Sequence, residues 1–327
     1  MDVINTPPSP AYLLKTCSDT KAWDDLIDSS AQGHVFSKSA YLKSLGKPYT
    51  CHVVTNIQGD ILAGAAILQD GSQMAKAPFA FTPHQGMVFS KAVNQLSDQK
   101  RLTAEFRITE FFMKALLDVY ANFSMAFSPY FKDLRPFLWH NHDKDGGPKF
   151  DVKLRYTGHI QLQNFDLSTF LGQVRVVRRQ EYKKTPAKIK PSDDLATFMH
   201  LYQQTFERQG INVTPSTLSL VEAICDQAMS GGYGFLSAAW MDERVASMAF
   251  FVTDRHCAYY LFGANDPLMR DAHASSKLLL DNISEFAHQG FQRFDFVGVN
   301  SPFRGDFKLS FNAELIPYQE VNLLAHA

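Results

Sequence analysis

Three side chains in polar segments have the chemistry to handle protons or anions. His273 lies in a loop just before an expected helix, where an imidazole with a pKa near neutrality can act as a general base. A capping or solvated histidine fits the same position. Arg135, two residues after Asp133, can clamp a carboxylate or phosphate, and a salt bridge to Asp133 explains it equally well. Arg304, or Asp306 in the same expected loop near the C-terminus, can orient an acceptor amine.

Phosphate binding has two further candidate positions. Ser275 or Ser276 can cap the expected helix, whose first N–H groups can hold a phosphate or an acyl carbonyl. A run of cations follows on overlapping faces of a helix expected from Asp166 to Lys184. It can receive the phosphates of a tRNA or a coenzyme, and a solvated helix face fits the same pattern. The cations of this run are Arg175, Arg178, Arg179, Lys183 and Lys184.

Metal and hydrolase chemistry have little support. His140 and His142 with Asp143 resemble metal ligands, but their loop has no third partner nearby, so we expect no metal site. The four cysteines are scattered without a CxxC pair, which favours reduced thiols. The chain has no GxSxG, HExxH or Walker motif.

The elements that must position these groups form a β–α–β pattern. Residues 258–262 are apolar and aromatic, as in a buried strand, and residues 294, 296 and 297 form a second apolar segment. Between them, residues 278–287 have helical periodicity, and Gly290 can end the helix. A crossover helix of this length predicts two parallel strands in one sheet.

Length and composition indicate two globular domains. The chain has 327 residues, 45% of them hydrophobic, and a net charge of −1, so no general nucleic-acid or membrane surface is indicated. The first residues lack a basic segment followed by an apolar run, and no window reaches the ~18 apolar residues of a membrane span. We therefore expect a cytoplasmic protein. Its oligomeric state is open.

Each half shows a similar order of elements: two helices, a strand–turn–strand unit, a strand, a helix and a strand. This order predicts an α/β (α+β) protein of two tandem modules, each a mixed central sheet flanked by helices. We expect the boundary at residues 164/165, so that the modules comprise residues 1–164 and 165–327.

The order of elements in the second half resembles the acetyltransferase (GNAT) fold. Its ending, FDFVGVNSPFRGDFKLSFNAELIPY, is similar to the end of the second module in FemAB-like tandem acyltransferases, which are related to the peptidoglycan aminoacyl transferases. Looser echoes are FSKSAYL, DLRPFLWH and TFERQGI. The resemblance spans nearly the whole chain and implies two GNAT-like modules.

This resemblance assigns a role to Lys308. It matches a lysine that lies beside the reacting carbonyl in the peptidoglycan members, and Phe307 matches its aromatic neighbour. A cationic amine there would stabilise the oxyanion of a tetrahedral intermediate. A surface lysine beside a buried phenylalanine is the alternative. Tyr259 or Tyr260 matches a site tyrosine, and only one can serve because neighbouring side chains on a strand point to opposite faces.

Two departures bear on the substrates. Thr214 and Leu218 stand where the peptidoglycan transferases have an Arg and a Tyr for a nucleotide-linked muropeptide, which argues against that acceptor. The GNAT pyrophosphate signature, Gln/Arg-x-x-Gly-x-Gly/Ala, is incomplete, because RDAHAS starts with Arg270 but has His273 in place of the first glycine. The signal for a coenzyme A donor at Arg270, Ser275 and Ser276 is therefore weak.

The expected function is an N-acyltransferase that moves an acyl group from acyl-CoA to an amine of a small or sugar-linked acceptor. Cell-envelope polysaccharide or nucleotide-sugar metabolism would supply such an acceptor. No tightly bound cofactor is expected, since the donor is a co-substrate. The alternatives are an aminoacyl-tRNA-dependent transferase, which would bind tRNA, and a non-catalytic family member that binds a glycan.

Overall fold

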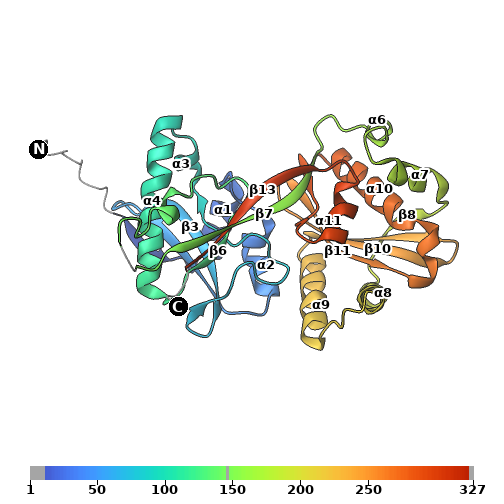
Figure 1. Cartoon of the computed structure of the whole chain (residues 1–327), viewed down its shortest axis with the longest axis horizontal. Coiled ribbons are helices and arrows are strands. Elements are labelled where there is room, and N and C mark those ends of the chain that lie inside the picture. Colours follow the sequence, from blue (N-terminus) through green and yellow to red (C-terminus); the bar gives the residue numbers. More distant parts are fainter. Residues whose placement is uncertain (1–11, 145–146, 324–327) are drawn as a thin grey trace, which may run out of the picture. The chain divides into compact units, whose positions relative to one another are not determined.

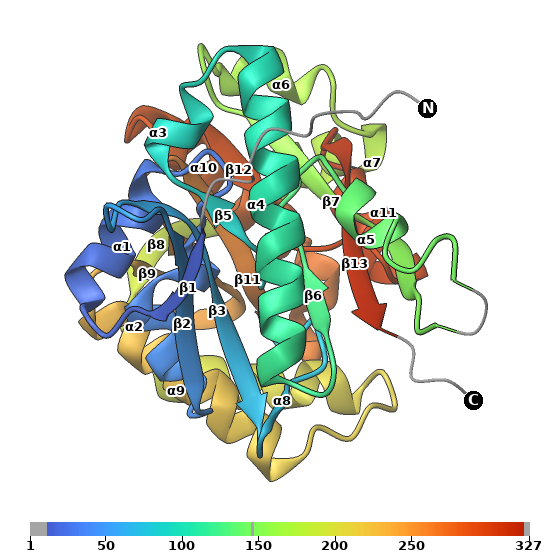
Figure 2. The same cartoon turned by 90° about the vertical axis from the view of Figure 1, so that its left-hand side faces the viewer.

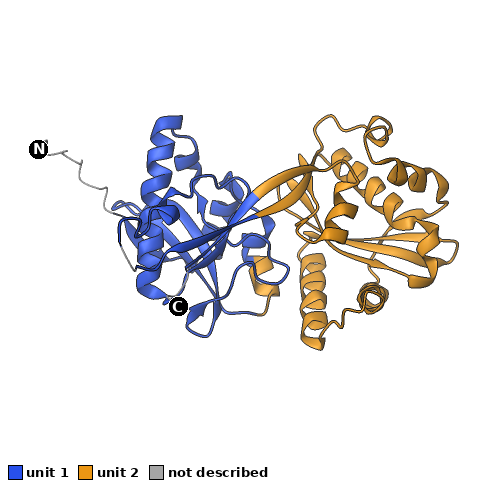
Figure 3. Ribbon diagram, viewed as in Figure 1, with its two compact units in different colours: residues 1–39, 47–154, 318–327 blue, residues 40–46, 155–317 orange. Residues whose placement is uncertain are grey.

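The computed structural model describes residues 12–144 and 147–323 (Figure 1). The chain forms two compact units: residues 1–39, 47–154 and 318–327 make the first, and residues 40–46 and 155–317 the second (Figure 3). The division therefore falls at 154/155 rather than at the expected 164/165. The last strand also returns to the first unit, which a single boundary in the sequence does not predict.

Elements of the N-terminal half follow the order expected for an α/β module. They are β1 (Leu13–Thr16), α1 (Thr20–Ser29), η1 (Val35–Ser37), α2 (Ser39–Ser44), β2 (Tyr49–Thr55), β3 (Ile61–Asp70), β4 (Gln73–Met74), β5 (Val88–Phe89), α3 (Lys91–Asn94), α4 (Asp98–Val119), β6 (Ser124–Ala126), α5 (Arg135–Leu138) and β7 (Phe150–Gln161).

Elements of the C-terminal half follow a similar order. They are α6 (Leu167–Leu171), α7 (Val176–Lys184), β8 (Lys188–Ser192), α8 (Leu195–Glu207), α9 (Pro215–Ser230), β9 (Gly234–Met241), β10 (Arg244–Thr253), β11 (Cys257–Asn265), η2 (Pro267–Ala272), α10 (Ala274–His288), β12 (Arg293–Asp295), α11 (Pro302–Leu309) and β13 (Glu314–Leu323).

The sheet of the first unit has the strand order β1-β2-β3-β4, with β5 also paired to β3, and these pairs are antiparallel. Helix α4 runs along this sheet (Figure 2) and buries Ile108, Phe112 and Leu116 in the same core as Ala65 of β3. Val321 of β13 belongs to this core too, and β13 pairs with β6. A segment from the C-terminus thus completes the first unit.

The sheet of the second unit has the order β7-β12-β11-β10-β9-β8 and is mixed, because β11 and β12 are parallel whereas the other pairs are antiparallel. Helices α7 and α10 lie on one side of it and α8 and α9 on the other (Figure 1). Leu279, Ile283 and Phe286 of α10 are buried against this sheet. The predicted parallel β–α–β unit is confirmed.

Two local predictions are wrong. The helix expected from Asp166 to Lys184 is two helices, α6 and α7, because Asp166 caps the short first one through Thr169 N–H (2.8 Å) and the backbone leaves helical geometry at Arg175. The loop expected to carry the C-terminal Phe-Lys pair is the helix α11, which begins at Pro302, a residue well suited to the first helical position.

Candidate active site

The pairing of β11 with β12 in the sheet of the second unit stops where β12 ends. Strand β12 pairs with β11 only along Cys257–Tyr259, whereas β11 continues to Asn265. On its other side, β11 pairs Tyr260 with Phe251 and Phe262 with Phe250, so Leu261 is an extra residue that forms a β-bulge. Past Tyr259, one edge of β11 therefore lacks β12 as a partner.

The two tyrosines at this point have different surroundings. The Tyr259 side chain is buried, and its hydroxyl donates a hydrogen bond to Asp254 Oδ2 at 2.6 Å. Burial raises the pKa of Tyr259 well above its usual value. Tyr260 packs its ring near Phe251 and Phe296, with centroid distances of 5.8 and 6.2 Å. Of the two tyrosines, Tyr260 is the one whose ring lies near Lys308.

The Tyr260 ring lies along its own strand. Its hydroxyl oxygen is 1.9 Å from the position that a β-carbon on residue 263 would occupy, so any residue other than glycine there would require the Tyr260 ring to move. Burial raises the pKa of Tyr260 to about 12, and the hydroxyl stays protonated at neutral pH. The Lys308 ammonium lies 5.8 Å from the ring centroid, within reach of a cation–π interaction.

Lys308 lies in the last turn of α11 and binds the loop that follows β12. Its Nζ donates hydrogen bonds to the carbonyl oxygens of Phe296, Val297 and Gly298 at 2.6, 3.1 and 3.1 Å. These bonds match the three donors of an ammonium group. Burial lowers the pKa of Lys308 from its usual value to about 8, while the charge of Asp295 acts in the opposite direction.

The same loop is held from its N–H side by a buried carboxylate. Asp295, 3% exposed, accepts hydrogen bonds from Thr157 Oγ1, from His159 Nε2 (3.1 Å) and from Val297 N–H (2.7 Å). Thr157 Oγ1 in turn accepts the Gly298 N–H at 3.1 Å. The sequence alone did not point to this group. A signal for it was the charged residue between two phenylalanines in the segment Phe-Asp-Phe.

A second polar cluster surrounds the start of α10. Glu181 of α7 accepts hydrogen bonds from Arg178 Nη1 and Ser276 Oγ, and its other oxygen lies 3.4 Å from His273 Nδ1. His273 occupies the N-cap position in the left-handed conformation, without a capping bond from its side chain. The prediction that Ser275 or Ser276 caps this helix is therefore wrong. The buried Ser276 hydroxyl is bound to Glu181 and Arg178 instead.

The remaining predicted residues of the second unit lie around these clusters. The Phe307 ring packs on Phe311 (5.1 Å between centroids), and the Arg178 guanidinium carbon lies 5.0 Å from the Phe307 centroid. Arg304 is exposed on α11, and its Nε donates a hydrogen bond to Ser301 Oγ at 3.3 Å. Arg270 is exposed on η2, and Ser275 is half-buried in the first turn of α10.

Arg135 belongs to the first unit, where it forms an ion pair with Asp133 and lies near two aromatic rings. Its Nε and Nη2 donate to the two carboxylate oxygens of Asp133 at 2.8 and 2.6 Å. The guanidinium also lies near the rings of Phe106 and Trp139, at 5.0 and 5.5 Å from their centroids. The salt-bridge alternative for Arg135 is what the structure shows.

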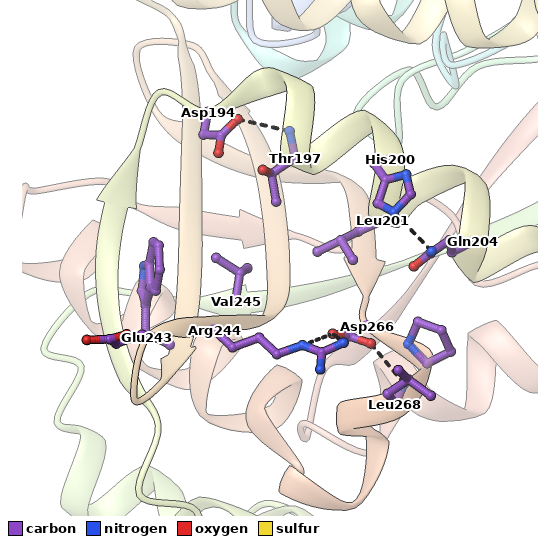
Figure 4. Close-up of a pocket in the computed structure, with 12 residues that line it drawn as sticks. Asp194, Thr197, His200, Leu201, Gln204, Glu243, Arg244, Val245, Asp266 and Leu268 are labelled. Atoms are coloured by element: carbon purple, nitrogen blue, oxygen red, sulfur yellow. Dashed lines mark hydrogen bonds and ion pairs between the residues drawn. The ribbon is translucent and has the colours of Figure 1, made fainter.

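A separate pocket of about 390 Å³ lies between α8, the β9–β10 turn and the loop after β11 (Figure 4). The Arg244 guanidinium is directed at the Asp266 carboxylate, with Nε 2.7 Å from Oδ2, and Gln204 bonds to His200. The pocket contains none of the residues predicted from the sequence. It is lined by Asp194, Thr197, His200, Leu201, Gln204, Trp240, Glu243, Arg244, Val245, Asp266, Pro267 and Leu268.

Residues 172–308, which include β11, α10, β12 and Lys308, match the family model of the acetyltransferase (GNAT) domain. Among solved structures, FemX is similar in fold at 13% sequence identity and a TM-score of 0.66, over 94% of this chain and 96% of that chain. The fold is that of tandem GNAT proteins. The predicted fold class is thereby confirmed, and so, at the level of the fold, is the predicted resemblance to FemAB-like proteins.

Two further structures share the tandem GNAT fold. One is a tandem GNAT protein from the clavulanic acid biosynthesis pathway, at 10% identity over 96% of this chain and 98% of that chain, with a TM-score of 0.52. The other is the C-terminal domain of a putative lysylphosphatidylglycerol synthetase from Agrobacterium fabrum, at 12% identity over 94% and 92% of the two chains, with a TM-score of 0.52. No curated protein matches the chain.

Residues 12–144 and 147–323 contain no group of three or more His, Cys, Asp or Glu side chains placed to hold a metal ion. Within the same described ranges, no helix combines the length and apolar character that crossing a membrane requires.

Proposed function

We propose that the chain is an N-acyltransferase whose reacting groups lie at the open edge of β11. The observation that supports this most directly is the buried Lys308 ammonium beside Tyr260, at the point where β12 ends inside the matched GNAT domain. A cation and an unpaired strand edge in one place suit a reaction in which negative charge develops on a carbonyl oxygen.

The chemistry needs few groups. The acceptor amine attacks the acyl carbonyl, a C–N bond forms, and the carbonyl oxygen becomes an oxyanion. Lys308 stabilises this oxyanion by turning one N–H from a loop carbonyl towards it. The C–S or C–O bond to the donor then breaks, and the amine loses a proton. His273 is the candidate proton acceptor, since Glu181 can hold its Nδ1–H and leave Nε2 basic.

Coenzyme A is the first donor to consider, because the matched domain is an acetyltransferase family. Arg270 and Ser275, near the start of α10, are the groups that would contact its phosphates. Arg304 and Phe307 would contact the acceptor. We propose a small or sugar-linked amine from cell-envelope or nucleotide-sugar metabolism as the acceptor.

One observation favours an aminoacyl-tRNA as donor instead. The Glu181 carboxylate, which is paired with Arg178, lies beside the first turn of α10 and binds Ser276, so a carboxylate already lies close to the N–H groups with which the helix would hold a pyrophosphate. An aminoacyl ester needs no phosphate at that position. FemX and the putative lysylphosphatidylglycerol synthetase, which share the fold, keep this alternative open.

A donor comparison tests both versions. Purified protein is incubated with acetyl-CoA or with charged tRNA and a panel of amino sugars, and transfer is followed by mass spectrometry. Transfer that is lost in Lys308→Ala supports the proposal, and the active donor decides between its two versions. A folded protein that transfers from neither donor but binds a glycan by calorimetry would instead be a non-catalytic member of the group.

A further inference from the structure

The loop between β12 and α11 has a conformation that needs external support. Val297 and Gly298 both have positive φ, at 54° and 74°. A β-branched residue rarely adopts this left-handed region, and such strain persists only where the surroundings enforce it. This conformation lets three successive carbonyls converge on one ammonium group, that of Lys308.

Asp295 holds the N–H groups of the same loop, whereas Lys308 holds its carbonyl groups. Its carboxylate binds the Val297 N–H directly and the Gly298 N–H through the Thr157 hydroxyl, while His159 binds its second oxygen. Thr157 and His159 come from β7, which pairs with β12 in register, His159 opposite Asp295. The N–H groups of the loop are therefore fixed by β7 and β12, and its carbonyls by α11.

The charges around Lys308 act in both directions. Asp295 on β12 favours the ammonium form, Arg304 on α11 disfavours it, and burial disfavours it most strongly. The Tyr260 ring on β11 presents its face at 5.8 Å, and Tyr260 stays neutral at physiological pH. His159 on β7 contacts Asp295 rather than Lys308.

We propose that Asp295, held by Thr157 and His159, is a positioning residue that shapes the 296–298 loop around Lys308 and keeps this lysine protonated. The geometric part depends only on the contacts above. The consequence for acyl transfer rests on the function proposed for Lys308. An Asp295 variant would then lose turnover more than substrate binding, because the ammonium acts on charge that develops during the reaction.

The test measures the titration of Lys308 without any substrate. Competitive labelling of amines at a series of pH values, read by mass spectrometry, gives the midpoint for Lys308 in the full chain. In Asp295→Asn we expect this midpoint to fall by about one pH unit, because a nearby carboxylate is lost. Asp306→Asn is the matched control: Asp306 is an exposed carboxylate on α11 that pairs with Arg175, so the midpoint should not change.

If Asp295→Asn does not fold, the proposal is tested with Thr157→Val instead. The Gly298 N–H then loses its acceptor, so its hydrogen exchange should accelerate at least about tenfold, and Thr157→Ser should restore the protection. A folded Asp295→Asn with an unchanged Lys308 midpoint, or a folded Thr157→Val with unchanged exchange at Gly298, would overturn the proposal.

The outcomes also separate this inference from the proposed function. A shifted midpoint in a protein that transfers from neither donor would leave the positioning role intact and remove the acyltransferase role. If Asp295→Asn transfers acyl groups with wild-type kcat and the midpoint of Lys308 is unchanged, the acyltransferase role stands and the positioning role of Asp295 is removed.

Discussion

The hydroxyl of Tyr260 lies against the backbone of Gly263, 1.9 Å from the position that a β-carbon there would occupy. The β-bulge at Leu261 lies between these two residues and brings the ring over its own strand. The ring in turn lies beside Lys308. The type of residue at position 263 therefore controls where the candidate site tyrosine can lie.

Gly263→Ala should displace the Tyr260 ring. The new methyl group would overlap the hydroxyl oxygen, so we expect a loss of acyl-transfer activity of at least tenfold and a lower melting temperature. In a Tyr260→Phe background the nearest ring atom is 3.0 Å away, and the penalty should be smaller. A double-mutant cycle on melting temperature measures this coupling. Additive effects would contradict the contact.

Lys308→Ala should reduce kcat by about 10²–10³-fold, the usual effect of removing one oxyanion donor. Steady-state kinetics with the active donor measure this loss. Lys188→Ala is the control, because Lys188 is an exposed lysine on β8. Equal activity of the two variants would exclude the catalytic role of Lys308.

The pH profile should report the titration of Lys308. Its pKa is about 8, so the ammonium form that stabilises an oxyanion is present below pH 8 and is lost as the pH rises through this value. We expect kcat to fall above pH 8 in the wild-type chain. An arginine stays charged, so any activity left in Lys308→Arg should not show this decline.

Stability should depend on pH in the opposite direction. The pKa of Lys308 is lower in the folded chain than the 10.5 of a free lysine, so the folded state releases this proton first. The cost of burying the charge is present below pH 8 and disappears between pH 8 and 10.5. Urea denaturation of wild type and Lys308→Met should show the wild type gaining stability relative to the variant over that range.

Tyr259→Phe should destabilise the second unit by about 1–3 kcal/mol, because it removes the hydroxyl that donates to Asp254 in a buried site. Tyr260→Phe should change the unfolding free energy much less, since within the described residues its hydroxyl has no hydrogen bond. Chemical denaturation of the two variants compares these effects. A larger loss for Tyr260→Phe would reverse our assignment of the two side chains.

Glu181→Gln should strengthen the binding of coenzyme A. The substitution removes negative charge beside the first turn of α10 while keeping a hydrogen-bonding group. A charge at a helix terminus contributes about 0.3–1 kcal/mol, so the affinity for coenzyme A should rise up to several-fold. Calorimetry measures the change. Glu285→Gln, an exposed residue in the last turn of the same helix, is the control. No difference between the two variants would argue that coenzyme A does not bind at this helix.

The regular elements of the second unit could be predicted because their signals are local. The apolar periodicity of α10 and the two short strands beside it predicts the parallel β–α–β unit that the structure shows. The start of α10 was predicted wrongly because two serines look like caps in sequence. In the structure, Ser276 turns to Glu181, 95 residues away, and His273 takes the cap position.

The polar contacts of the candidate site were not predictable either, because they join residues that are far apart in the sequence. Thr157 is 138 residues from Asp295, and only the pairing of β7 with β12 brings them together. Lys308 could be selected through the family resemblance, yet that resemblance placed it in a loop. The three carbonyls around its ammonium depend on a left-handed backbone conformation at Val297. A β-branched residue rarely adopts this conformation, so the sequence does not predict it.

The return of β13 to the first unit has a consequence for synthesis. Val321 is buried in the first core, and Gln319 O accepts the Phe127 N–H. A ribosome therefore delivers every residue of the second unit before it delivers residues 318–323, the part of β13 that belongs to the first unit. Until β13 has been synthesised, the edge of β6 to which it pairs has no partner strand. An unpaired edge of this kind is a position where a nascent chain can mispair or recruit a chaperone. The first unit can therefore be completed only after the whole second unit has been synthesised.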